Sequence, residues 1–202
     1  MIQQANKILV TLLLALTVCV QAHAGKLIKK FDLGTGPLKA GYTQLSGTSI
    51  YTPETGFGFI PSGKLKTGVQ AGNDSLTGDW IRSDKAFSFK IDLPEGRYKI
   101  TITLGNPVTA SATTVKAESR RLMLENVQTK PGEVVTRTIV VDLRTPKIND
   151  SLEVRRKPRE MAYLNWDNSL SLEFNGPAPC VSSIEIEEAN DLPIVFIAGD
   201  ST

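Results

Sequence analysis

Apolar and polar residues alternate with a period of two along most of this 202-residue chain, and no segment keeps a helical period for three turns. The clearest alternation runs from Phe87 to Leu93 and again from Tyr98 to Leu104, with a Pro94-Glu95-Gly96-Arg97 turn between the runs. Two such runs around a Pro/Gly turn predict a β-hairpin with one buried and one solvated face. The pattern restricts the chain to a mainly β fold.

Further short runs of the same kind are separated by turns rich in Gly, Pro, Asn and Asp. The expected strands cover 27–33, 57–60, 121–125, 135–143, 169–174 and 183–187. Regular short strands between such turns are typical of an antiparallel β-sandwich or jelly roll.

The stretch from Ile194 to Ala198 is different, because its apolar residues are consecutive. A strand without a polar face is expected in a parallel sheet that is covered on both sides. We therefore predict a β domain over residues 25–190, followed over 191–202 by the first strand of an α/β domain that the chain does not complete.

Residues 1–24 have the pattern of a secretory signal peptide. Lys7 precedes an apolar run from Ile8 to Val20, and Ala22-His23-Ala24 fits a cleavage site. Lipidation at Cys19 is the alternative, which the bulky Val18 before it disfavours. The segment predicts export to the periplasm or the extracellular space, with no membrane association after cleavage.

Charge and cysteine content exclude several classes of protein. The net charge is +2 and no basic stripe is present, which argues against a nucleic acid partner. Beyond the predicted signal peptide, Cys180 is the single cysteine, so the β domain has no internal disulfide. Metal-ligand spacings and nucleotide motifs are absent, so we expect neither a metal nor a cofactor.

A possible nucleophile follows the apolar run, in the segment Gly199-Asp200-Ser201-Thr202. A serine on a glycine-led turn after a buried strand is a known way of presenting a nucleophile. Such a serine needs a base, usually a histidine, and the chain's one histidine, His23, lies in the predicted signal peptide. We therefore expect no turnover from this chain as given.

The residues PIVFIAGDST at 193–202 resemble the first conserved block of SGNH/GDSL hydrolases, and AGDST resembles the rhamnogalacturonan acetylesterase branch. The upstream segments FDLGTG (31–36), GYTQLSGTSIYTPETGFGF (41–59) and FSFKIDLPEGRYKITITLG (87–105), together with RRLMLENV (120–127) and LSLEFNGPAPCVSSIEIEE (170–188), resemble the β domain of exported bacterial pectin esterases. This resemblance implies a galactose-binding-like sandwich.

The resemblance assigns Ser201 as the nucleophile and its N–H as an oxyanion donor, with Asp200 shaping the turn. It implies removal of O-acetyl groups from pectic polysaccharide through an acyl-enzyme. The family's later glycine, asparagine and D-x-x-H blocks have no counterpart in this chain. Gly72-Asn73-Asp74 resembles the family's G-x-N-D block, but it lacks the residue between Gly and Asn. It also precedes the nucleophile instead of following it, so we interpret it as a turn.

The candidate sugar-stacking residues of the β domain are Trp80 and Trp166, each with polar neighbours, together with Tyr163, Tyr42 and Tyr51; burial in the core or in a domain interface is the alternative for these aromatics. The carboxylates and amide at Asp79, Asp84, Asp167 and Asn168 suggest a calcium site or, more simply, turns. The basic run over 155–159 could attract an acidic polysaccharide or be a solvated strand end.

The sequence thus predicts the N-terminal part of an exported esterase that removes acetyl groups from pectic polysaccharide. A stand-alone carbohydrate-binding module is the first alternative, and a β domain that only braces a catalytic domain is the second.

Overall fold

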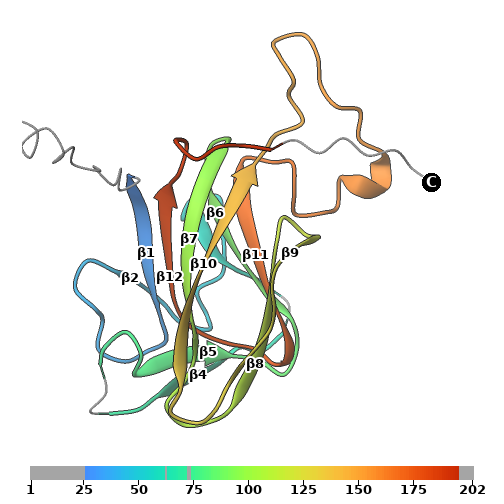
Figure 1. Cartoon of the computed structure of the whole chain (residues 1–202). Helices are drawn as coiled ribbons and strands as arrows, with labels where there is room; N and C mark the ends of the chain where they lie inside the picture. Colours follow the sequence, from blue (N-terminus) through green and yellow to red (C-terminus); the bar gives the residue numbers. More distant parts are fainter. Residues whose placement is uncertain (1–25, 62, 72–73, 196–202) are drawn as a thin grey trace, which may run out of the picture.

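The computed structural model describes residues 26–61, 63–71 and 74–195. These residues form twelve strands in two curled sheets and one 3-10 turn, η1 (Pro158–Glu160), with no α-helix among them (Figure 1). The predicted mainly β sandwich is confirmed. No helix in the described part of the chain is long and apolar enough to cross a membrane.

The first sheet has seven strands, with β10-β7-β12-β1-β2 in order, β5 also paired with β12, and β4 paired with β5. Its strands are β1 (Leu27–Leu33), β2 (Thr43–Leu45), β4 (Lys66–Val69), β5 (Asp79–Arg82), β7 (Gly96–Gly105), β10 (Val134–Leu143) and β12 (Cys180–Glu188). All pairs are antiparallel except β1 with β2.

The second sheet has five strands in the order β3-β6-β11-β8-β9. Its strands are β3 (Phe57–Ile60), β6 (Phe87–Asp92), β8 (Ser111–Ala117), β9 (Arg121–Thr129) and β11 (Ser169–Ala178). The alternation predicted for β9 is wrong at its start, because register shifts between β8 and β9 leave Leu122 exposed and turn Met123 and Leu124 toward the core.

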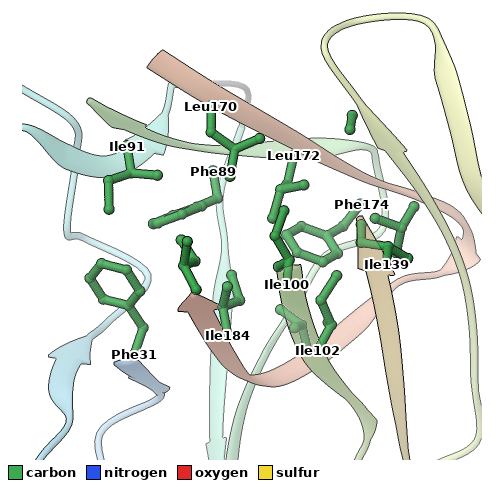
Figure 2. Close-up of a cluster of buried hydrophobic side chains, with 14 of the residues drawn as sticks. Phe31, Phe89, Ile91, Ile100, Ile102, Ile139, Leu170, Leu172, Phe174 and Ile184 are labelled. Carbon is green, nitrogen blue, oxygen red and sulfur yellow. The ribbon is translucent and has the colours of Figure 1, made fainter. Parts of the chain in front are cut away.

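The core fills the space between the two sheets. Figure 2 shows Phe31, Ile100 and Ile184 of the first sheet facing Phe89 and other apolar side chains of the second. The rings of Phe31 and Phe89 meet edge to face, with centroids 5.1 Å apart. Burial of these alternating side chains supplies the main driving force for folding.

The predicted hairpin between the runs at 87–93 and 98–104 does not form. β6 pairs with β3 and β11, whereas β7 pairs with β10 and β12, so the Pro94 turn carries the chain from one sheet to the other. Both runs nevertheless bury their apolar side chains as predicted. The alternation specifies a buried face, and two facing sheets satisfy that requirement as well as a hairpin does.

The lone thiol of Cys180 is buried at the start of β12. Burial raises its pKa to about 11, although the side-chain amide of Asn106 donates a hydrogen bond to the sulfur at 3.3 Å. The thiol is therefore protonated at neutral pH, which makes it a packing residue.

The chain leaves the sandwich after β12 in an irregular conformation. Ile194 and Val195, where we expected a buried strand to begin, lie outside any strand, and Val195 is 83% exposed. The remainder of that predicted strand, Phe196 to Ala198, lies outside the described residues, as do the predicted signal peptide and Gly72-Asn73.

Candidate functional site

A long connection of residues 144–168 joins β10 to β11; we call it the excursion. It extends beyond the end of the sandwich (Figure 1). A small hairpin forms its first part, where Lys147 pairs with Glu153, and η1 follows. No side chain of the excursion belongs to the buried core, so its residues are available at the surface.

Glu95, in the turn between β6 and β7, fixes the start of the excursion. Its carboxylate accepts hydrogen bonds from the Thr145 amide at 3.1 Å, from the Thr145 hydroxyl at 2.8 Å and from the Arg144 guanidinium at 2.9 Å. The pKa of Glu95 is below its usual value, mainly because of the hydrogen bond from the Thr145 amide and then because of that from the Thr145 hydroxyl. The excursion is thus anchored to the sandwich where it leaves β10.

Three cavities of about 210, 330 and 360 Å3 adjoin one another along the excursion. The first and second share Arg120 and Tyr163 as lining residues, and the first and third share Arg156 and Trp166. We call this continuous surface the excursion groove. Aromatic side chains, guanidinium groups and amides therefore line neighbouring cavities on this surface.

Trp166 lies in the groove in a strained backbone conformation. Its φ is +58°, which a bulky residue adopts rarely, and its carbonyl accepts a hydrogen bond from Nη1 of Arg156 at 3.4 Å. The next residue, Asp167, accepts the Ser169 amide at 3.0 Å and so forms a turn. Strain of this kind persists where the surroundings enforce it, and it is often found at binding sites.

Tyr163 and Arg120 form the second aromatic part of the groove. The Arg120 guanidinium lies 4.5 Å from the centroid of the Tyr163 ring, and the Tyr163 side chain is 40% exposed. Arg120 follows a tight turn between β8 and β9 in which Glu118 and Ser119 both have positive φ. Cation–π contact and the rigid turn together restrict the position of the guanidinium.

The buried carboxylate of Glu118 connects that turn to the excursion. Its Oε1 accepts the Ser171 amide at 3.0 Å, and the Ser171 hydroxyl donates to the carbonyl of Leu164 at 2.7 Å. Burial raises the pKa of Glu118. The groove is therefore assembled from two distant parts of the chain through a buried polar contact.

Trp80, the other tryptophan predicted to stack, is 5% exposed and belongs to the interior. Its indole covers Gly68 on the paired strand β4 so closely that a Cβ on residue 68 would clash with the ring. The core alternative therefore holds for Trp80, and the two tryptophans do not form one platform. Trp166 alone of the pair reaches the groove.

The other predicted site residues are placed as follows. Ser201 and Asp200 lie outside the described residues, so their assignment stays a prediction. The basic run over 155–159 forms no strand end; it belongs to the excursion, and Arg156 turns into the groove. Within the described ranges, no three His, Cys, Asp or Glu side chains gather in a way that could hold a metal ion.

The fold defines a class of protein, the galactose-binding-like β-sandwich domains. A family model described as "Beta-agarase/YXIM esterase-like, galactose-binding domain-like" matches residues 29–132, and the chain belongs to this family. The matched range includes Arg120 and ends before the excursion.

Two curated relatives are similar over much of the chain. "Uncharacterized esterase YxiM" of Bacillus subtilis is 24% identical over 184 residues, which cover 87% of this chain and 41% of the relative. "Beta-agarase A" of Zobellia galactanivorans is 29% identical over 125 residues, covering 59% of this chain and 22% of the relative. The chain thus spans less than half the length of either relative, and it is an esterase-related domain.

Solved structures agree on the fold. The crystal structure of the B. subtilis YxiM protein superimposes with a TM-score of 0.55 at 19% identity, covering 83% of this chain and 41% of the other. The crystal structure of the plant peptide RALF23 in complex with FER and LLG2 gives a TM-score of 0.52 at 14% identity. The match covers 82% of this chain and 41% of the other. At these identities the likeness is one of architecture alone.

Proposed function

We propose that this chain is the carbohydrate-binding front domain of an exported SGNH/GDSL-type esterase that removes O-acetyl groups from pectic polysaccharide. In this proposal the excursion groove binds the polysaccharide, and Ser201 is the nucleophile of a catalytic domain that follows. Asp200 shapes the turn that presents Ser201. The family membership supports the esterase part, because one relative of more than twice the matched length is named an esterase.

The observation that carries the binding function is the exposed aromatic lining of the groove. The indole of Trp166 suits the C–H face of a sugar ring, because it combines an apolar surface with a polar edge, and the ring of Tyr163, which carries Arg120 on one face, adds apolar surface beside it. The amide of Asn165 and the guanidinium groups beside them can donate hydrogen bonds to hydroxyl groups. Sugar sites combine apolar and polar groups in this way.

Calorimetric titration of the chain with pectic oligosaccharides tests the binding function. Trp166→Ala is expected to weaken binding by about five- to thirtyfold, because a stacked aromatic contributes on the order of 1–2 kcal/mol. Tyr42→Ala is the matched control, since Tyr42 lies next to β2, at the opposite side of the first sheet. Absence of heat with every pectic oligosaccharide would remove the binding function.

The esterase function is tested separately in a chain that includes the proposed catalytic domain. Ser201→Ala is expected to lower acetate release from acetylated pectin by several orders of magnitude, because a nucleophile and its base act as a unit. Substantial activity in that variant would show that Ser201 is not the nucleophile.

A further inference from the structure

Arg120 and Arg156 line the same cavity of about 210 Å3, at the centre of the excursion groove. Ten ion pairs join side chains in the described part of the chain, and neither of these arginines takes part in one. Two guanidinium groups that line one cavity, with neither in an ion pair, repel each other. Their placement in one cavity therefore needs an explanation.

Both guanidinium groups are held in place by contacts that leave donors free. Arg120 rests on the Tyr163 ring, and Arg156 uses Nη1 to bond the carbonyl of Trp166. A guanidinium carries five N–H donors in a planar fork that matches a carboxylate. Each arginine thus retains N–H groups for a ligand, and little side-chain entropy remains to be lost on binding.

Glu160 is the acidic residue that lines this cavity, and it is already engaged. Its Oε2 accepts the main-chain N–H of Lys157 at 2.8 Å, which caps η1. Its side chain forms no ion pair with either arginine among the described contacts. The cavity therefore presents a net positive charge to a ligand, between the aromatic walls of Tyr163 and Trp166.

We propose that this cavity is a subsite for the carboxylate of a uronic acid unit, with Arg120 and Arg156 donating to the carboxylate oxygens and Trp166 covering the sugar ring. The subsite rests on the proposed sugar binding and specifies that the bound sugar unit is negatively charged. The cavity is smaller than the roughly 300 Å3 at which sites for drug-sized ligands begin, which suits one sugar unit. Neighbouring units of the polymer occupy the adjoining cavities.

Titration with a galacturonic acid oligomer and with its fully methyl-esterified counterpart tests the subsite. The two ligands have the same backbone and differ in charge. The chain is expected to bind the free acid about tenfold or more tightly than the ester, because charge-assisted hydrogen bonds contribute about 1.5–3 kcal/mol. Higher salt is expected to reduce that preference.

Arg120→Gln and Arg156→Gln are each expected to weaken binding of the acid much more than binding of the ester, and so to abolish most of the preference for the acid. Arg137→Gln is the matched control, because Arg137 on β10 is also exposed and also donates Nη1 to a main-chain carbonyl, that of Thr136 at 3.0 Å. Arg156→Lys keeps the charge without the fork and is expected to be intermediate. Circular dichroism of each variant checks that it is folded.

The outcomes separate the subsite from the proposed function. Equal affinity for acid and ester, unchanged in the arginine variants, overturns the carboxylate subsite and leaves sugar binding intact. Preference for a sulfated galactan over the uronate also overturns it. Absence of binding to all ligands overturns sugar binding itself, and the subsite with it.

Discussion

At the scale of single residues, the least expected feature is a pair of buried carboxylates, Asp32 on β1 and Asp79 on β5. Each accepts one main-chain N–H: Lys39 donates to Asp32 at 2.8 Å and Gly36 donates to Asp79 at 2.7 Å. Burial, together with the charge of Asp32, raises the pKa of Asp79 to about 6. Asp79 thus keeps its proton under mildly acidic conditions, and burial also raises the pKa of Asp32.

This pKa predicts how stability depends on pH. The pKa of Asp79 is above its unfolded value of 3.8, so the native state binds the proton more tightly, and that contribution is lost as pH rises through about 6. Asp79→Asn mimics the protonated form and has no such loss. The melting temperature of Asp79→Asn, relative to the unmodified chain, is therefore expected to increase between pH 4 and pH 7, as scanning calorimetry can measure.

Asp84→Asn is the control for that measurement. Asp84 is exposed and forms an ion pair with Lys66, which lowers its pKa, so its contribution has the opposite sign. A difference between Asp79→Asn and the unmodified chain that stays constant with pH would contradict the assignment. The sequence interpretation of Asp79 as a turn residue is wrong, because Asp79 begins β5. The sequence also could not show Asp32 beside it, because their contact depends on the packing of β1 near β5.

At the scale of secondary-structure elements, the sequence predicts eight of the twelve described strands, misses β2, β4, β5 and β8, and predicts strand partners poorly. The strands β1, β3, β6 and β7 lie close to where alternation predicted them, because the period of two comes from the pleat itself. Pairing depends on which strands meet across the whole chain. Ile91 lies opposite Phe57 and Leu170, for example, and neither belongs to the run that follows the Pro94 turn.

The turn between β6 and β7 has a role that the predicted hairpin would not give it. Glu95 in that turn accepts the Thr145 amide and hydroxyl, so it links the turn to the excursion. Glu95→Ala is expected to lower the free energy of unfolding by about 0.5–1.5 kcal/mol, because it removes the exposed hydrogen bonds from Thr145, which water then replaces in part. Urea denaturation measures the loss, and amide exchange at Thr145 is expected to accelerate.

The effect of Glu95 has a defined pH dependence. Its pKa is lowered in the native state, so its contribution is present above the unfolded pKa and is lost as the pH falls through the lowered value. Glu125→Ala removes an exposed carboxylate from β9 and is expected to change stability little. Equal losses in the two variants would show that Glu95 does not anchor the excursion.

Single residues of the candidate site could be predicted from the sequence, but the way they come together could not. Trp166 was identifiable by residue type, and Arg156 belonged to a visible basic run. Arg120 could not be linked to them from the sequence, because its position depends on the turn between β8 and β9 and on the buried contact of Glu118 with Ser171. The signal available in the sequence was the density of arginines and aromatic residues between 155 and 166.

At the scale of the whole molecule, the sandwich presents the groove and the onward chain at the same end. β10 ends with Leu143 opposite Gly96, and β12 ends with Glu188 opposite Tyr98, so the two strands finish beside the same part of β7. The excursion starts from one and the onward chain from the other (Figure 1). A polysaccharide bound in the groove, as proposed, would therefore be held near the segment that leaves β12.

This arrangement separates folding from binding. The buried core comes from the strands of both sheets, and the excursion adds no side chain to it. The ends of the excursion also lie close together, since Pro146 and Trp166 line one cavity. A short Gly/Ser linker in place of residues 147–165 can therefore close the gap with a small entropic cost, because loop closure depends only weakly on length.

The shortened chain is expected to keep the β-sheet circular dichroism spectrum and to melt within a few degrees of the unmodified chain, because surface loops contribute little to global stability. The same variant is expected to lose binding to pectic oligosaccharides, since it lacks Arg156 and Tyr163. A sandwich that still binds would place the sugar site on the sheets, and one that fails to fold would show that the excursion is part of the folding unit. Retained folding with lost binding is the outcome that assigns the groove to the excursion.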